Sequence, residues 1–153
     1  MDMNGSAAEI PEILDSDPAS SARTIVLAHG AGVDMRSPLM AAFSEGLTVH
    51  GLRVVRFDFP YMSKARRVAR RRPPDREPVL LQTWRTMIQR LGARDLIIGG
   101  KSLGGRTASL IADESAVAGL VCLGYPFHPP GKPASDRRTA HLANLRTPTL
   151  ICQ

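Results

Sequence analysis

Short apolar runs alternate with longer amphipathic stretches along the chain. Runs rich in β-branched and other apolar residues, bounded by glycine, proline or polar residues, are typical of buried strands. Such runs predict strands at residues 24–28, 53–59, 95–99, 117–124 and 149–152. Between them, apolar residues recur at helical spacing, which predicts helices at residues 38–50, 78–91 and 103–112.

Two of these helices carry recognisable start signals. Ser37 precedes Pro38, an arrangement that suits an N-cap followed by proline at the first helical position. Pro78 opens the second helix in the same way. Trp84 lies in the apolar stripe of that helix, so we expect it to pack in the core rather than to contact a cofactor.

Strand–helix alternation of this kind predicts an α/β fold, with a mostly parallel sheet flanked by helices. We expect a single domain over residues 23–153, preceded at residues 1–22 by a polar tail or an edge strand. The segments 60–74 and 125–146 are expected to be loops. The last strand would then form an exposed apolar edge, which favours marginal stability or association.

The positive charge of the protein is concentrated in one segment. The net charge is +6, and residues 64–76 account for all of it, with seven basic residues against Asp75 alone. A solvated loop is the simpler interpretation; the alternative is a patch that binds an anionic ligand or partner. No aromatic residue interrupts the basic run, which argues against nucleic acid as the partner.

The remaining composition indicates a cytoplasmic protein. No apolar run is long enough to span a membrane, and residues 1–21 lack the apolar stretch of a signal peptide. Cys122 and Cys152 lie in apolar runs and have no metal-ligand spacing, so both are expected to be small core residues in a reducing compartment. Neither a metal nor a cofactor is predicted.

A candidate nucleophile stands between a predicted strand and a predicted helix. Residues 100–104 read Gly-Lys-Ser-Leu-Gly and match the G-x-S-x-G pattern in the context that the pattern requires. A sharp strand-to-helix turn there would expose the hydroxyl of Ser102 above the sheet. The N-terminus of the following helix would face the reacting carbonyl, and the Leu103 N–H would be one oxyanion donor.

A second oxyanion donor is expected after an earlier strand. The strand at 24–28 runs into His29-Gly30-Ala31-Gly32, where the backbone can approach a ligand closely. Ala31 is the candidate for that N–H, and Gly32 is the alternative. Gly100-Lys101-Ser102 also resembles the end of a P-loop, but Asp95 stands where that motif needs glycine, so a nucleotide site is disfavoured.

The chain resembles the α/β-hydrolase superfamily. The matching motifs are HGAGVDMRSP, RFDFPYM, GGKSLGGR and GYPFHPPGKP, which begin at His29, Arg56, Gly99 and Gly124. Within the superfamily it is similar to dienelactone-hydrolase-like proteins, and to small bacterial proteins related to testis-expressed and NSL-complex subunit proteins of animals. The resemblance implies Ser102 as the nucleophile, an oxyanion hole from the His29–Gly32 turn and Leu103, and a basic stretch near the mouth of the site. The expected partner is a small-molecule acyl substrate.

The resemblance also implies catalytic partners that the sequence does not supply at the family positions. The family acid follows the strand that begins at Thr149 and the family histidine comes later, so both are expected beyond residue 153. A local triad of Ser102 with Asp136 and His141 is the alternative. The candidate substrate-binding residues are His29, Lys101 and His128, although His29 could instead brace its loop.

Two aspartates and one further histidine are also considered as site residues. Asp34 and Asp58 follow strands at the carboxyl edge of the predicted sheet, where ligands bind in such folds. Asp34 is better explained as a residue that stabilises its own turn. His50 closes the first predicted helix and is expected at the surface.

Two hypotheses follow from the sequence. The first is a serine hydrolase that acts on esters, thioesters or similar acyl compounds through Ser102. The second is a non-catalytic module of the same fold, which binds an anionic partner through residues 64–76.

Overall fold

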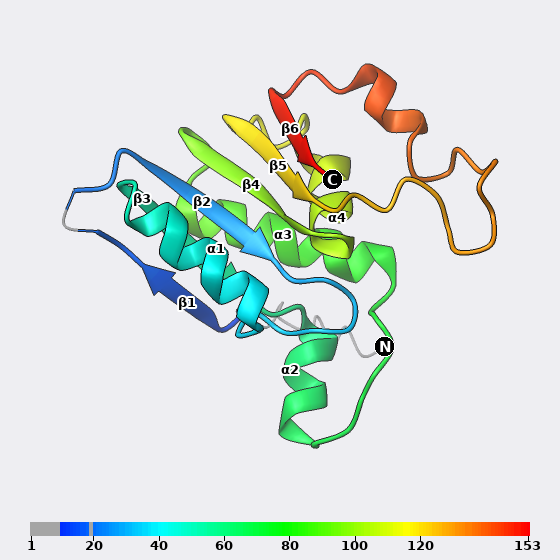
Figure 1. Cartoon of the computed structure of the whole chain (residues 1–153), viewed down its shortest axis with the longest axis horizontal. Helices are drawn as coiled ribbons and strands as arrows, with labels where there is room; N and C mark the ends of the chain where they lie inside the picture. Colours follow the sequence, from blue (N-terminus) through cyan, green and yellow to red (C-terminus); the bar gives the residue numbers. More distant parts are fainter. Residues whose placement is uncertain (1–9, 19) are drawn as a thin grey trace, which may run out of the picture.

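A computed structural model of the chain describes residues 10–18 and 20–153. Its centre is one sheet of six strands (Figure 1). The strands are β1 (Ile13–Ser16), β2 (Arg23–Ala28), β3 (Leu52–Phe57), β4 (Leu96–Lys101), β5 (Gly119–Leu123) and β6 (Thr149–Cys152).

The strand order β1-β3-β2-β4-β5-β6 creates a switch point beside β2. From β2 the chain passes to β3 on one side and then to β4 on the other, and every one of these pairings is parallel. Only β1 runs antiparallel, along the outer edge of β3. In open α/β sheets ligands bind outside the carboxyl ends of strands at such a point, which here follows the paired residues Ala28 and Gly100.

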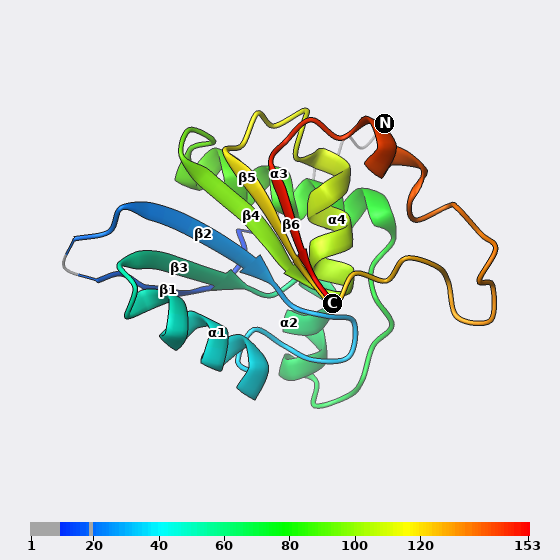
Figure 2. The same ribbon diagram turned by 45° about the horizontal axis from the view of Figure 1, so that its top comes forward.

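The helices lie on both faces of the sheet (Figures 1 and 2). On one face lies α1 (Pro38–Thr48), and on the other lie α3 (Glu77–Leu91) and α4 (Leu103–Ile111). Successive side chains of β2 point to opposite faces of the sheet and so pack against both helix layers. Ile25 and Leu27 join the cluster packed with α1, whereas Val26 and Ala28 join the larger cluster under α3 and α4.

Trp84 is a central residue of the larger cluster. Its side chain is fully buried, and its ring meets that of Phe57 edge-on with centroids 4.9 Å apart. The indole N–H donates a 3.0 Å hydrogen bond to Thr107 Oγ1, which joins α3 to α4. The core position predicted for Trp84 is confirmed.

The α/β fold class is confirmed, and several local expectations need correction. Residues 60–74 do not form a continuous loop, because α2 occupies Pro60–Arg67 with proline in its first turn. The expected loop at 125–146 contains a short 3₁₀ helix, η1, at Ala140–Asn144. Ser37 does precede α1, yet its side chain makes no capping hydrogen bond.

The two cysteines differ in environment. Cys122 is buried, and burial raises the pKa of its thiol to about 12. Cys152 is exposed, contrary to expectation, because β6 forms the outer edge of the described sheet. The proposed tail at residues 1–22 lies partly outside the described residues, and its described part contains the edge strand β1.

An apolar hollow of about 540 Å³ lies between α1 and the β6 side of the sheet. It is lined by side chains such as Phe43, Ile97 and Leu150, and Leu150 is 60% exposed. Among residues 10–18 and 20–153, no helix has the length and hydropathy that crossing a membrane requires.

The Trp84 contact yields a stability prediction. Trp84→Phe removes the hydrogen bond to Thr107 and leaves a small cavity, so we expect a loss of about 2 kcal/mol in the free energy of unfolding. Urea denaturation followed by circular dichroism measures it. A loss of less than about 0.5 kcal/mol would contradict a central packing role for the indole.

Candidate functional site

Ser102 lies at the sharp turn between β4 and α4. Its backbone has φ 47° and ψ −108°, a conformation that residues other than glycine rarely adopt. Two hydrogen bonds hold this turn: the Ser102 N–H donates to the carbonyl of Leu123 at 2.9 Å, and its carbonyl accepts from the Arg106 N–H at 2.9 Å. Strained backbone that is held so firmly is typical of functional sites.

Glycines at the turn allow two backbone segments to pass unusually close. A Cβ atom on Gly100 would lie 2.1 Å from the carbonyl oxygen of Ala28, and one on Gly104 would lie 2.3 Å from the same oxygen. Real Cβ atoms essentially never approach so closely. The first and last glycines of the G-x-S-x-G pattern therefore bring the start of α4 against the end of β2, where the His29–Gly32 loop begins.

His29 holds this loop from inside the protein. The side chain is completely buried; one ring nitrogen, Nδ1, lies 2.7 Å from the carbonyl oxygen of Gly30, and Nε2 accepts from the Phe59 N–H at 3.1 Å. Burial lowers the pKa of His29. A neutral ring that donates from Nδ1 satisfies both contacts, and the geometry makes His29 a brace of the loop.

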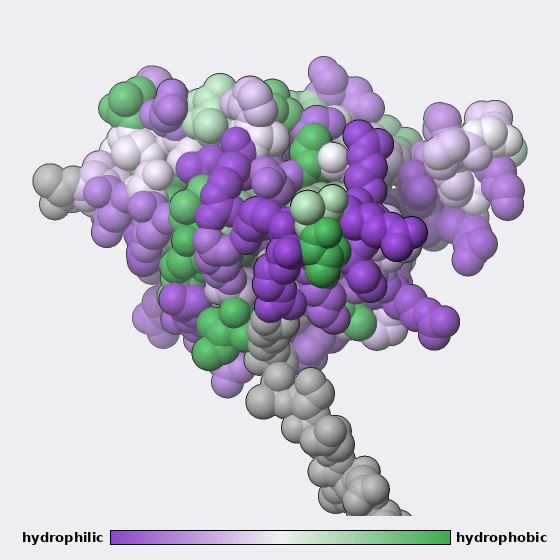
Figure 3. Space-filling view, turned by 90° about the horizontal axis from the view of Figure 1, so that it is seen from below, coloured by the Kyte–Doolittle hydropathy of each residue, from purple (hydrophilic) through white to green (hydrophobic). Residues whose placement is uncertain are grey.

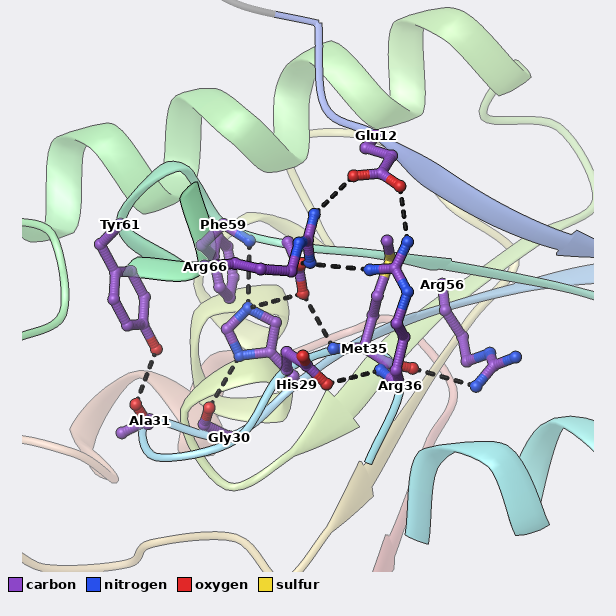
Figure 4. A network of polar contacts seen from close by, with 12 residues as sticks. Glu12, His29, Gly30, Ala31, Met35, Arg36, Arg56, Phe59, Tyr61 and Arg66 are labelled. Atoms are coloured by element: carbon purple, nitrogen blue, oxygen red, sulfur yellow. Dashed lines mark hydrogen bonds and ion pairs between the residues drawn. The ribbon is translucent and has the colours of Figure 1, made fainter. Parts of the chain in front are cut away.

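A buried carboxylate connects the same region to α2 (Figure 4). Asp58 is 1% exposed, accepts the Met35 N–H at 2.8 Å and forms a short ion pair with Arg66. The Arg66 guanidinium also donates to the Glu12 carboxylate, which accepts a second hydrogen bond from Arg36 at 2.6 Å. Arg36 in particular lowers the pKa of Glu12 through this hydrogen bond.

Tyr61 forms a second connection between α2 and the loop. Its hydroxyl donates to the carbonyl of Ala31 at 3.0 Å, and its backbone N–H donates to the Asp75 carboxylate at 2.8 Å. Burial raises the pKa of the Tyr61 hydroxyl, which keeps it a donor. The carbonyl of Ala31 is thus fixed, and with it the orientation of the adjoining peptide.

The predicted oxyanion donors come from the two segments that the glycines bring together. Leu103 is the first residue of α4, so its N–H has no acceptor within the helix. Ala31 lies in the loop after β2, and a Cβ atom on Gly30 would contact the Lys101 carbonyl oxygen at 3.7 Å. Lys101 is the last residue of β4 and is partly buried beside that loop.

His128 lies elsewhere. It belongs to the loop after β5, which projects from the body of the molecule (Figures 1 and 2), and its side chain is exposed. The Arg138 guanidinium donates to the His128 carbonyl at 3.0 Å. The structure does not place this side chain at the turn around Ser102.

No histidine of the chain is hydrogen-bonded to Ser102, and all four lie within the described residues. His141 Nε2 lies 2.8 Å from Ser109 Oγ instead, on the buried side of α4. The alternative triad of Ser102, Asp136 and His141 is therefore not formed. In residues 10–18 and 20–153, no three side chains of the histidine, cysteine or acidic types are grouped to hold a metal ion.

Sequence reasoning missed the roles of Asp58 and Arg66. Asp58 was considered only as an edge residue and Arg66 only as part of a basic run, whereas the two form an ion pair in which the carboxylate is buried. The sequence held a signal for this pairing. Pro60 favours the start of a helix, and a helix that begins there places Arg66 near Asp58, eight residues earlier in the chain. Asp34 does stabilise its own turn, since it accepts the Arg36 N–H at 2.8 Å.

Comparisons with known proteins agree with this fold. A family model described as an alpha/beta hydrolase domain matches residues 21–153. An alpha-beta serine hydrolase homologue from Coxiella burnetii has 19% identity and a TM-score of 0.72 over 92% of this chain and 66% of its own. A serine hydrolase described as lidless, from Xanthomonas campestris, has 14% identity and a TM-score of 0.63 over 92% and 64%.

A monoacylglycerol lipase from Paleococcus ferrophilus has 21% identity and a TM-score of 0.60, over 78% of this chain and 47% of its own. At these identities the likeness shows the fold. The chain spans about two thirds or less of the lengths of these structures. The narrower resemblance to dienelactone hydrolases and NSL-complex subunits stays a prediction.

The close approach at the turn gives a testable prediction. In Gly104→Ala the new methyl group would collide with the backbone of Ala28, so we expect a loss of about 2 kcal/mol or more in the free energy of unfolding. Gly46→Ala is the matched control, because Gly46 lies within α1 with nothing near its Cβ position. That control should gain up to about 1 kcal/mol in urea denaturation. Equal effects of the two substitutions would refute the steric explanation.

One buried and one partly buried histidine, His29 and His141, predict a pH dependence of stability. Burial lowers the pKa of both His29 and His141 in the folded state, so the unfolded chain binds more protons as the pH falls below about 6.5. Stability should therefore fall between pH 7.5 and 5.5, by at most about 1.4 kcal/mol per pH unit for each histidine. Urea denaturation across this range tests it. His141→Gln should flatten the slope, and a rise in stability on acidification would disprove the assignment.

Proposed function

Because the chain belongs to the family of alpha/beta hydrolase domains, we propose that it carries the nucleophile and oxyanion hole of a serine hydrolase that acts on acyl compounds. The observation that carries the proposal is the left-handed backbone of Ser102 between β4 and α4. The adjoining glycines and the His29–Gly32 loop support it, as do the esterase, lipase and serine hydrolase descriptions of the structural neighbours.

The proposed chemistry has two steps. Ser102 Oγ attacks the acyl carbonyl and loses its proton to a base, while the carbonyl oxygen becomes an oxyanion that accepts from the N–H groups of Leu103 and Ala31. Collapse of this intermediate breaks the bond to the leaving group and leaves an acyl serine. Water then hydrolyses the acyl serine and regenerates the hydroxyl.

The proposal assigns no residue of this chain as the general base. Lys101 lies beside the oxyanion loop and is proposed to contact the substrate there. His29 contributes by holding the loop, and His128 is left as a more distant candidate for substrate contact. A base supplied in solution should therefore accelerate acylation of Ser102, since an alcohol without a base is a weak nucleophile.

Acylation by an activated ester tests the proposal. The chain is incubated with p-nitrophenyl acetate, with and without added imidazole as the base, and peptide mass mapping locates the acetyl group. We expect imidazole-stimulated acetylation of Ser102, and Ser102→Ala should release p-nitrophenolate only at the background rate of buffer and imidazole.

Ser115→Ala is the matched control, because Ser115 is also partly exposed and lies just beyond the other end of α4. It should leave acetylation of Ser102 unchanged. Acetylation spread over several serines, or unaffected by Ser102→Ala, would refute the proposal.

A non-catalytic binding module remains the second candidate, because one part of the basic segment is not engaged in ion pairs among the described residues. Residues 70–72 are exposed arginines and line a cavity. If binding of an anionic partner is the whole function, salt-sensitive binding should persist while Ser102 shows no acylation under any condition. Ser102-dependent ester hydrolysis excludes this candidate.

A further inference from the structure

The basic segment is not uniform, because its arginines differ in whether they pair with acidic side chains. Arg66 is engaged in ion pairs within the molecule, with the buried Asp58 and the exposed Glu12. In contrast, Arg70, Arg71 and Arg72 form no ion pair with any described carboxylate. Other arginines across the molecule do have acidic partners, among them Arg36, Arg53, Arg85 and Arg106.

The unpaired arginines line a cavity of about 360 Å³ beside the candidate oxyanion hole. One wall consists of Ala31, Gly32 and Asp34 from the loop after β2, and α2 contributes Met62 and Ala65. The rest of the lining is Arg66, Ala69, Arg70, Arg71 and Arg72. Figure 3 shows the side of the molecule that lies lowermost in Figure 1, where α2 is drawn, and hydrophilic side chains dominate it.

Hydrogen bonds fix the arginine segment at its start. The Ala69 N–H donates to the Arg66 carbonyl at 3.3 Å, and the Arg70 N–H donates to the Ala65 carbonyl at 3.1 Å. This is the Schellman pattern, which normally has glycine at the position that Ala69 occupies with φ 49°. A left-handed alanine costs about 1–2 kcal/mol, and the chain holds this strain directly before the three arginines.

The segment is also fixed near its other end. The Asp75 carboxylate accepts the Tyr61 N–H, and the Tyr61 hydroxyl donates to the Ala31 carbonyl. The arginines are thus carried on a segment whose two ends are bonded to α2, and α2 is bonded to the oxyanion loop. This arrangement holds positive charge at a defined place next to the loop.

We propose that Arg70, Arg71 and Arg72 bind the negatively charged group of the substrate, so that the preferred substrates are acyl esters carrying a carboxylate or a phosphate. The assignment rests on the proposed hydrolase function. Asp34 is the only described acid in the lining, so the three arginines dominate the charge that a ligand meets. The small volume favours a small anion over a nucleic acid, for which a basic face would extend over several elements.

Paired esters test the proposal. p-Nitrophenyl hemisuccinate and p-nitrophenyl butyrate differ mainly in a carboxylate on the acyl side, and 4-acetoxybenzoate and phenyl acetate differ in a carboxylate on the leaving group. The rate of Ser102 acylation is compared within each pair in the presence of imidazole. We expect the charged member of at least one pair to react about tenfold faster, and added salt to reduce that preference.

The variant that replaces Arg70, Arg71 and Arg72 by Gln should lose this preference and leave reaction with the neutral esters unchanged. Its matched control replaces Arg23, Arg94 and Arg137 by Gln, which are exposed arginines outside the cavity lining, and so changes the net charge equally. The control should keep the preference. Absence of any preference in the original chain, or its persistence in the cavity variant, would overturn the proposal.

Binding of succinate separates this proposal from the proposed function. Calorimetry with the Ser102→Ala chain should detect salt-sensitive succinate binding that the triple cavity variant lacks. Asp34→Asn should strengthen that binding, because the amide oxygen still accepts the Arg36 N–H while the repelling charge is gone; unchanged affinity would count against the site. Succinate binding without any acylation of Ser102 would refute both the hydrolase function and the substrate assignment. Acylation of Ser102 without succinate binding would refute the substrate assignment alone.

Discussion

The contact between the end of β2 and the start of α4 determines how the rest of the site is built. The Ala28 carbonyl occupies the space that a side chain on Gly100 or Gly104 would need. The end of β2 and the β4–α4 turn therefore pack together through backbone atoms, with no side chain between them. This brings the helix N-terminus, the strained serine and the His29–Gly32 loop to one point at the strand switch. A larger residue at Gly100 or Gly104 would move Ser102 away from the loop that is proposed to stabilise the oxyanion.

The second layer of the site depends on charge placed where water cannot reach it. Asp58 is buried and its partner Arg66 lies at the surface, so removing Arg66 leaves the buried carboxylate without its nearest counter-charge. The same carboxylate binds the backbone of Met35, so β3, the loop before α1 and α2 are joined at one residue. The hydrogen bonds of Tyr61 to the Ala31 carbonyl and of His29 to the Gly30 carbonyl then hold the peptides on either side of Ala31 in place.

The sequence allowed the sheet, three of the helices and the Ser102 turn to be predicted, because each rests on local patterns. Periodicity placed Trp84 in the core, and the strand–turn–helix context placed Ser102 at a helix start. The helix α2 was missed because it is short, three of its eight residues are basic, and its contacts with Asp58 and Asp75 lie outside the helix itself. Cys152 was misplaced because its apolar run gave no sign that β6 lies at an edge. Pairing between residues far apart in sequence leaves no periodic signal.

The bond between the Tyr61 N–H and the Asp75 carboxylate has a consequence for how this protein could change over evolutionary time. It closes the intervening residues into a loop with a fixed base, and the entropy of closing such a loop grows only slowly with its length. Residues 70–74, which follow α2 and lie before the Asp75 anchor, can be inserted, deleted or exchanged without moving the base. The fold thus places an exchangeable segment beside a fixed site geometry, so ligand preference can change there while the chemistry at Ser102 stays the same.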